Sequence, residues 1–466
     1  MNRAVGFIVA AVLAGSGCGD NFGPPPMTQS QLLQKLRALP GVSKVEQGSG
    51  AKNLSYYVLH FTQPIDHENP SLGSFEQEVS LLHRNEQAPV PMVVNTSGYA
   101  DIDRNVPVEL TRLLDGNQVS IEHRYYGGSR PVPTDWSKLT IKQAADDEHA
   151  VIEALKTIYG GEFLSTGVSK GGMTAVFHRR FWPDDVDGTV AYVAPISFGA
   201  PDPRYPKQFD KIGSDDCRAA VRALAAETLA RRDQMELRAA DEEGDTYTRV
   251  KIGPAVEAAI SGLEWGFWQY ATADACAQLP RTTATDQELY DFLEDHSAVS
   301  EYTDEALARY EAYYYQSYSQ LGYPDGYAEY LSGGLRYGDA DYLGELPCDE
   351  PAYDSEVMRS IAQWAEDFGE RLLFVYGGWD PWFAGRFPVG SAAQSKSFVK
   401  DDGNHETKLA SLDPLNRGPA FAMIKQWTGV EPMMSRVYHR DTTTAVDTTE
   451  RRTPRLRGAG APHARR

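Results

Sequence analysis

Apolar positions in the first two hundred residues follow two alternating spacings. Runs typical of strands cover residues 56–61, 75–82, 90–95, 118–121, 163–166 and 189–194. Between them, apolar side chains recur at helical spacing in residues 29–39, 141–158 and 170–181. Strands that alternate with helices predict a mostly parallel sheet that is covered by helices on both faces.

The pattern changes near residue 200. Residues 200–355 carry almost no strand signal, and residues 218–240 are typical of a helix. Strand-like runs return at 371–376 and 397–399. We therefore expect an α/β core formed by residues 30–199 and 356–432, with residues 200–355 inserted as a helical cap.

Both ends of the chain differ from this core. Residues 1–18 combine Arg3, a short apolar run and small residues before Cys18, which is typical of an export signal of the lipoprotein type. A proline-rich linker is expected at residues 19–29, and a polar, disordered tail at residues 433–466. We expect an exported protein, either extracellular or anchored at the cell envelope through a lipid on Cys18.

Export permits a disulfide, and Cys217 with Cys276 is the expected pair because both lie in one segment. The formal net charge of −20 argues against nucleic acid as a partner and is compatible with a positively charged substrate. No Cys/His cluster has zinc spacing, so no metal and no organic cofactor is expected. We expect a monomer whose membrane contact is limited to the anchor.

A nucleophile is predicted at Ser169. The residues from Gly167 to Gly171 match G-x-S-x-G, between a short strand and a helix, as a nucleophile elbow requires. The alternative is a glycine-rich turn with an idle serine.

A serine hydroxyl needs a base and an orienting acid, which follow it in the order acid then histidine on an α/β-hydrolase core. His405 lies in a loop after the strand-like run 397–399, and Asp380 follows the run 371–376. Asp402, three residues before His405, is the alternative acid. The oxyanion hole needs two backbone N–H groups, which we expect from Lys170 and from Gly98 or Tyr99.

Five segments together resemble one family. They are Phe61–His67, Glu122–Gly127, Gly167–Gly172, Gly377–Trp382 and Gly403–His405. In this order the chain resembles the secreted bacterial prolyl tripeptidyl aminopeptidases, relatives of prolyl carboxypeptidase and dipeptidyl-peptidase II, from about residue 50 to 430. The resemblance implies an α/β-hydrolase core with a helical cap between the serine and the acid, and the triad Ser169, Asp380 and His405. It also implies release of short N-terminal peptides by cleavage after proline.

A peptidase that recognises a free N-terminus needs a carboxylate for the ammonium group and an apolar slot for proline. Glu264, Trp265 and Trp268 in the cap supply both, and Asp202 is a second carboxylate candidate. The alternative for the aromatic rings is packing inside the cap. Within the run Glu122–Gly127, Arg124 is expected to pair with an acid as scaffold near the site.

Two other functions remain open at this point. A secreted esterase or lipase could use the same core, although the insertion is dense in Asp, Glu and Tyr, where a lipase would need an apolar entrance. A non-enzymatic surface lipoprotein is the third reading, against which the complete triad argues.

Overall fold

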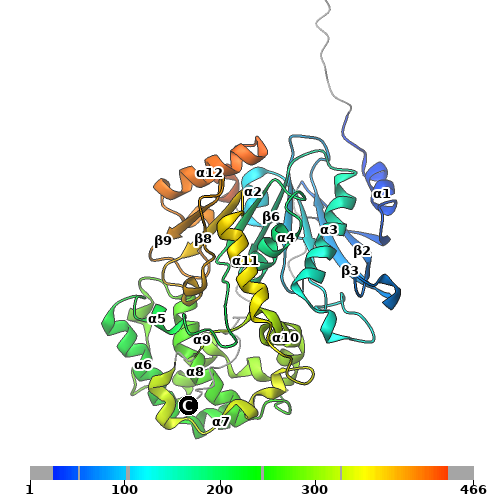
Figure 1. Cartoon of the computed structure of the whole chain (residues 1–466). Coiled ribbons are helices and arrows are strands. Elements are labelled where there is room, and N and C mark those ends of the chain that lie inside the picture. Colours follow the sequence, from blue (N-terminus) through cyan, green and yellow to red (C-terminus); the bar gives the residue numbers. More distant parts are fainter. Residues whose placement is uncertain (1–24, 51–52, 101–104, 243–245, 326–327, 439–466) are drawn as a thin grey trace, which may run out of the picture.

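A nine-stranded sheet forms the centre of the part of the chain that the structure describes. The computed structural model describes residues 25–50, 53–100, 105–242, 246–325 and 328–438. The strands lie in the order β1-β2-β3-β5-β4-β6-β7-β8-β9 (Figure 1). Their bounds are β1 (Val42–Gly48), β2 (Ser55–Pro64), β3 (Ser74–His83), β4 (Met92–Thr96), β5 (Asn117–Ile121), β6 (Phe163–Val168), β7 (Gly188–Tyr192), β8 (Leu372–Gly377) and β9 (Lys396–Lys400). Strands β1, β2, β3 and β5 pair antiparallel, and the strands from β5 across to β9 pair parallel.

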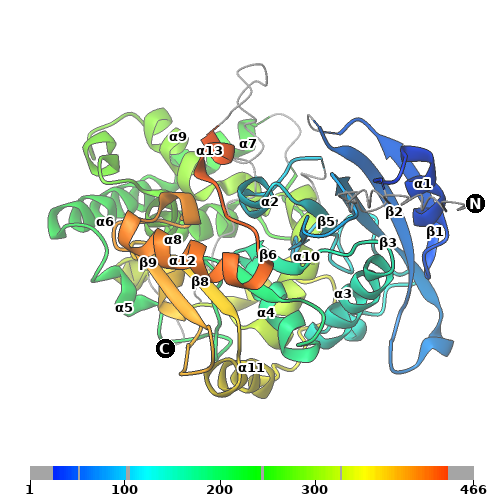
Figure 2. The same cartoon turned by 90° about the horizontal axis from the view of Figure 1, so that it is seen from above.

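Helices cover both faces of this sheet (Figure 2). One face carries α3 (Ile141–Lys156), α4 (Lys170–Phe181) and α11 (Ser355–Asp367), and the other carries α2 (Glu109–Leu114) and α12 (Pro414–Thr428). Apolar side chains of α2 and α12, such as Leu113 and Ile424, share one buried cluster with Val93 and Val375 of the strands. The short helix α1 (Gln29–Arg37) packs beside β1 at the antiparallel edge.

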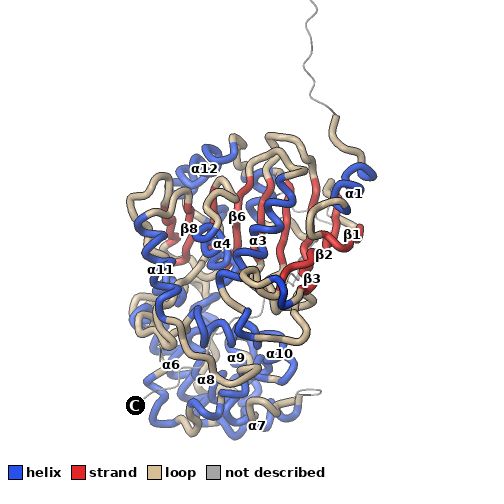
Figure 3. The backbone as a smooth tube through the Cα atoms, turned by 45° about the vertical axis from the view of Figure 1, so that its right-hand side comes forward, coloured by secondary structure: helices blue, strands red, loops and turns tan. Residues whose placement is uncertain are grey.

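The chain leaves the sheet after β7 and builds a helical layer before it returns through α11. Figure 3 shows this layer at one end of the sheet. It contains α5 (Pro206–Phe209), α6 (Asp215–Ala230), α7 (Arg232–Asp241), α8 (Ile252–Tyr270), α9 (Asp286–Ser297) and α10 (Asp304–Gln316), followed by short helical turns. The architecture is therefore an α/β-hydrolase core with a mostly helical cap, as the sequence predicts.

Helix α8 is the central element of this cap. It is apolar on nearly every face, and its residues from Gly253 to Gln269 are all buried. A helix that is apolar all round is stable only when neighbours enclose it, and α6, α7 and α9 pack against it. Cys217 of α6 and Cys276, the expected pair, form a disulfide with a Cα–Cα distance of 5.6 Å.

Several expectations about the ends are corrected. The tail expected to be disordered from residue 433 instead begins with α13 (Met434–Tyr438), because Met434 and Val437 pack on the cluster beneath α2 and α12. The expected linker 19–29 ends earlier, since α1 begins at Gln29. The signal 1–18 with Cys18, and residues 439–466, lie outside the described residues.

Two internal details also differ. The expected helix 218–240 is two helices, α6 and α7, that meet at Arg231. Strand β1 carries no buried side chain and alternates too weakly to predict from its sequence. None of the helices in the described ranges is long and apolar enough to cross a membrane.

Candidate active site

Ser169 stands at a strained turn between β6 and α4. Its backbone has φ 55° and ψ −122°, a conformation that costs a side-chain-bearing residue free energy. The turn is held because the Ser169 N–H donates to the carbonyl of Tyr192 at 2.9 Å and the Ser169 carbonyl accepts from Met173 at 3.0 Å. This is the geometry of a nucleophile elbow, which holds the serine at the carboxyl edge of the sheet.

The neighbouring glycines make this turn sterically possible. A Cβ added to Gly167 would lie 2.3 Å from the carbonyl carbon of Gly171. A Cβ added to Gly171 would lie 2.3 Å from the carbonyl oxygen of Thr96 on the adjacent strand. Both glycines are therefore required by close backbone approach, which the sequence motif alone only suggests.

Asp380 and His405 meet at the same edge of the sheet. Asp380 follows β8 and His405 follows β9, and both side chains are buried. The Nδ1 atom of His405 lies 2.6 Å from Oδ2 of Asp380, and Oδ1 of Asp380 accepts a hydrogen bond from the backbone N–H of Trp382 at 3.0 Å. Both carboxylate oxygens are thus occupied, which fixes the ring of His405 with Nε2 directed away from the acid.

The alternative acid takes no part in this arrangement. Asp402 is exposed, and its carboxylate pairs with Lys400 at 2.6 Å. That ion pair and its hydrogen bond lower the pKa of Asp402, so it stays a surface carboxylate. Glu406, which follows the histidine, is exposed as well.

The cap helix α8 holds the loop that carries the histidine. The N–H of His405 donates to the carbonyl of Gln269 at 2.9 Å. The side-chain amide of Asn404 donates to the carbonyl of Tyr270 at 3.0 Å. The last turn of a helix has carbonyls without partners in that helix, and this loop satisfies them.

The outer nitrogen of His405 is available for chemistry. Within the described ranges, Nε2 is buried and has no hydrogen-bond partner. The ring of Trp382 lies 6.4 Å from the ring of His405 and also lines a pocket together with Ser169. A buried acceptor nitrogen next to a serine pocket is what a general base requires, and such catalytic contacts often tighten only with substrate bound.

The expected oxyanion-hole residues surround the start of α4. Gly98 has φ +71°, and a Cβ there would lie 2.6 Å from the nitrogen of Gly171. Tyr99 and Lys170 line the pocket that contains Ser169. The first N–H groups of a helix lack partners within it, so the N–H of Lys170 is suited to an anion.

The pocket itself is mostly apolar and aromatic. Core and cap both contribute its lining, which consists of Tyr99, Ser169, Lys170, Met173, Pro195, Ser197, Tyr313, Leu321, Gly322 and Trp382. The indole N–H of Trp382 is buried without a partner among the described residues. Sequence reasoning passed over Trp382, although its position two residues after the acid was a usable signal.

The carboxylate proposed for the substrate amine is already paired. Glu264 is fully buried, and its two oxygens accept from Nε of Arg222 at 2.9 and 3.0 Å. Glu264 does not line the pocket with Ser169. This pairing argues against the expected role in amine binding: from α8, Glu264 pairs with the partly exposed guanidinium of Arg222 on α6.

The other candidates from the sequence are also structural. Asp202 is buried and binds the guanidinium of Arg204 with both oxygens, at 2.7 to 3.1 Å. Trp265 packs on Trp382 with ring centroids 4.8 Å apart, one layer behind the pocket. Trp268, on α8 of the cap, packs against Trp379, which follows β8. These rings fill the cap core, which was the alternative interpretation.

Arg124 has the scaffold role expected of it. Its Nε and Nη2 donate to Asp147 at 2.6 and 2.8 Å, and its side chain is fully buried.

In the described part of the chain, no group of three His, Cys, Asp or Glu side chains could hold a metal ion.

Comparison with known proteins identifies the family. Residues 28–452 match the model of the family described as PS-10 peptidase S37. The chain is 39% identical over 439 residues to a prolyl tri/tetrapeptidyl aminopeptidase of Streptomyces mobaraensis, covering 92% of this chain and 91% of that protein. The human lysosomal Pro-X carboxypeptidase is 32% identical over 171 residues, which cover 31% of this chain and 33% of that protein.

A solved structure gives only a distant match. The proline iminopeptidase of Mycobacterium smegmatis is 14% identical, with a TM-score of 0.37, and the match covers 79% of this chain and 98% of that one.

The family model and the sequence relatives confirm the resemblance to the prolyl tripeptidyl aminopeptidases. Because the family model spans most of the chain and a full-length relative is well above 30% identical, this protein belongs to the PS-10 peptidase S37 family.

Proposed function

We propose that this serine peptidase releases short peptides from free N-termini by cleaving after proline. The observation that carries the proposal is the Asp380–His405 hydrogen bond, formed at the sheet edge that also carries the strained Ser169. Membership of the peptidase family and the activity named for the Streptomyces relative support the choice of peptides over esters.

The reaction follows from the positions of the three side chains. Oγ of Ser169 attacks the carbonyl carbon of the proline residue while Nε2 of His405 takes the hydroxyl proton. Asp380 holds the ring and stabilises the imidazolium that forms. The proton then passes to the leaving amine, the C–N bond breaks and an acyl ester remains on Ser169. Water, deprotonated by His405, attacks this ester and releases the peptide acid.

The negative charge on the tetrahedral intermediate needs two donors. The N–H of Lys170 is one, and the N–H of Tyr99 is the other, on the loop after β4 that contacts the start of α4. Each such donor contributes about 10²–10³-fold in rate in comparable sites.

The lining of the pocket supports proline as the residue before the cleaved bond. Tyr313, Trp382 and Met173 give flat and flexible apolar surface of the kind a pyrrolidine ring packs against. Tyr313 belongs to α10, so the cap forms part of the slot. A slot closed from the cap side favours chain ends over folded protein segments.

We place the enzyme outside the cytoplasm, as a monomer without nucleic acid partners. The apolar N-terminal run before Cys18 and the Cys217–Cys276 disulfide support export, since disulfides persist in oxidising compartments. A lipid on Cys18 would supply the membrane attachment.

Two matched substrates test the proposal. A tripeptide p-nitroanilide that ends in proline is compared with its N-acetylated form, with wild-type enzyme and Ser169→Ala. We expect cleavage of the free-amine form only, lost in the variant. Cleavage of both forms would remove the free-N-terminus requirement. Failure on both, with Ser169-dependent hydrolysis of p-nitrophenyl acetate, would instead indicate the esterase.

A further inference from the structure

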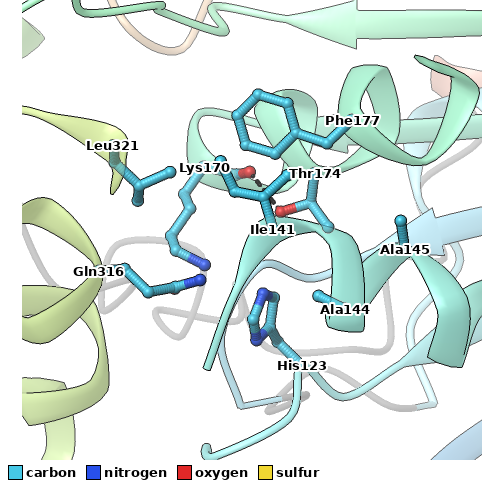
Figure 4. Close-up of a pocket in the computed structure, with 9 residues that line it drawn as sticks. All are labelled: His123, Ile141, Ala144, Ala145, Lys170, Thr174, Phe177, Gln316 and Leu321. Carbon is cyan, nitrogen blue, oxygen red and sulfur yellow. Dashed lines mark hydrogen bonds between the residues drawn. The ribbon is translucent and has the colours of Figure 1, made fainter. Parts of the chain in front are cut away.

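The residue after the nucleophile carries a buried positive charge. The side chain of Lys170 is 3% exposed, although lysine is among the residue types least often buried. Its Nζ donates to the carbonyl oxygen of Gly98 at 2.5 Å. Figure 4 shows the ammonium group beside His123 and Gln316 at a small cavity behind the elbow. The mechanism above uses only the backbone of Lys170, so this side chain has no role yet.

The carbonyl that Lys170 binds belongs to a peptide group of the oxyanion loop. The Gly98–Tyr99 peptide is trans, so its C=O and its N–H point in opposite directions. The ammonium binds the C=O on the side of the small cavity, while Tyr99 lines the pocket of Ser169. Fixing the oxygen on one side therefore aims the Tyr99 N–H toward the other.

Other contacts leave this peptide little freedom. The backbone of Gly98, at φ +71°, lies against the nitrogen of Gly171. Nζ of Lys170 lies 5.2 Å from the ring centres of both Tyr99 and Tyr126, and cation–π attraction holds it there. The next carbonyl of the loop, that of Tyr99, accepts a hydrogen bond from the hydroxyl of Ser97 at 2.7 Å. Two successive carbonyls of the loop are thus bound, and the N–H between them is aligned.

The charge also changes the strength of the donor. A cation bound to a carbonyl polarises the whole peptide group, and hydrogen bonds in such a chain strengthen one another. The N–H of Tyr99 therefore becomes a better donor to an anion than an ordinary amide. Burial lowers the pKa of the Lys170 ammonium to about 7, against the opposing attraction of Glu148, which shows that the fold tolerates this charge at a cost.

We propose that Lys170 is a positioning residue whose side-chain ammonium aligns and polarises the Gly98–Tyr99 peptide as an oxyanion-hole donor. The inference rests on the proposed function of Ser169, but it applies to any acyl substrate that passes through a tetrahedral intermediate. In this proposal the side chain of Lys170 contributes to binding of the transition state, in addition to the backbone N–H groups of the oxyanion hole.

Three variants test this role. Lys170→Met keeps the length and packing of the side chain without a donor, and Lys170→Gln keeps a donor without the charge. Lys156→Met on α3 is the matched control, because Lys156 is partly exposed and does not line either pocket. For each protein, kcat and KM are measured with the proline tripeptide anilide and with p-nitrophenyl acetate. The inhibition constant of the corresponding peptide boronic acid, whose adduct is tetrahedral, is measured in parallel.

For Lys170→Met we expect kcat to fall about 10²-fold with both substrates while KM changes less than about twofold. The inhibition constant of the boronic acid should rise by a similar factor, since both report binding of the tetrahedral state. Lys170→Gln should recover part of the loss and Lys156→Met should match wild type. The melting temperature of Lys170→Met should not fall, because an apolar side chain replaces a buried charge.

Unchanged kcat in Lys170→Met would overturn the proposal. A loss of kcat that follows a lower melting temperature in both Lys170 variants would also overturn it, since that indicates a structural role. If Lys170→Met does not fold, Lys170→Gln provides the test. A wild-type kcat in Lys170→Gln would show that the positive charge of Lys170 does not contribute to catalysis. If the wild-type enzyme cleaves the ester but not the anilide, only the proposed cleavage after proline is refuted. The kinetics on the ester then still test the role of Lys170.

Discussion

Nδ1 of His405 and Oδ2 of Asp380 are 2.6 Å apart, and this hydrogen bond joins the loops after β8 and β9. The two residues are 25 positions apart in the sequence, but the parallel pairing of their strands brings the loops to the same edge. No Lys or Arg of the described residues pairs with the acid, and its second oxygen accepts the backbone N–H of Trp382. Its charge is therefore directed at the imidazole.

Replacing this acid tests the assignment directly. Asp380→Asn should lower kcat about 10³–10⁴-fold with little change in KM, because the amide favours the wrong tautomer of His405. Steady-state kinetics on the proline anilide measures this. Asp402→Asn is the control and should stay near wild type, since exposed Asp402 pairs with Lys400 and not with His405. A larger loss in Asp402→Asn than in Asp380→Asn would reverse the assignment.

The unpaired indole of Trp382 predicts a contact with the substrate. Trp382→Phe keeps an aromatic ring against Trp265 but removes the buried N–H. Loss of one hydrogen bond to a peptide carbonyl should lower kcat/KM up to about 10-fold, with less effect on p-nitrophenyl acetate. Trp364→Phe on α11, which does not line the pocket, is the control. Equal losses on both substrates would instead indicate a general effect on packing.

Glu264 should matter for folding rather than for substrate affinity. Glu264→Gln leaves Arg222 without its counter-ion and should lower the free energy of unfolding by about 1–3 kcal/mol. KM for free-amine peptides should remain unchanged. Urea unfolding and kinetics on the same samples provide both values. A rise in KM at wild-type stability would restore Glu264 as the group that binds the substrate amine.

The ammonium of Lys170 predicts an alkaline limb in the pH profile. Its pKa is lowered to about 7 by burial, so the charge is present below this value and is lost as the pH rises through it. Its polarisation of the oxyanion loop is lost with it, and kcat should decline with a midpoint near pH 7. The titratable groups facing it are Glu148 on α3, His123, Tyr99 and Tyr126, and burial shifts the pKa of each toward its uncharged form.

Two variants assign this limb. Lys170→Met should abolish it. Glu148→Gln should move it to lower pH to the extent that Glu148 is ionised, because only the charged carboxylate attracts the ammonium and raises the pKa of Lys170. An unchanged limb in Lys170→Met would attribute the decline to another group. Profiles of kcat between about pH 5 and 9 are sufficient, provided that circular dichroism shows the variants folded throughout.

Local pattern was enough to predict the core. Strand β8 is a continuous apolar run that is buried throughout, the helix α4 is buried from Lys170 to Arg179, and the glycines around Ser169 have one steric meaning. Strand β1 lacks this signal because it lies at the sheet edge with no buried residue. The helix α13 was missed because it is short and its apolar contacts with the core, among the described side chains, come from Met434 and Val437 alone.

The specificity residues were harder for a physical reason. A free carboxylate and a paired one look alike in a sequence, so Glu264 was expected to bind an amine, with Asp202 as a second candidate. Arg222 and Arg204, which neutralise them, are 42 and 2 residues away, and only the folded chain shows the pairing. The role of the Lys170 side chain likewise depends on a loop 72 residues earlier.

The histidine loop is bound to the cap and not only to the sheet. Gln269 and Tyr270, at the end of α8, accept hydrogen bonds from His405 and Asn404. A cap that swung open as a rigid lid would pull the base away from the acid, so substrate must enter while this seam stays closed. Replacement of the cap to obtain a new specificity would therefore also change the orientation of His405, the general base. In this enzyme, selectivity and catalysis cannot be exchanged as separate modules unless the end of α8 is kept.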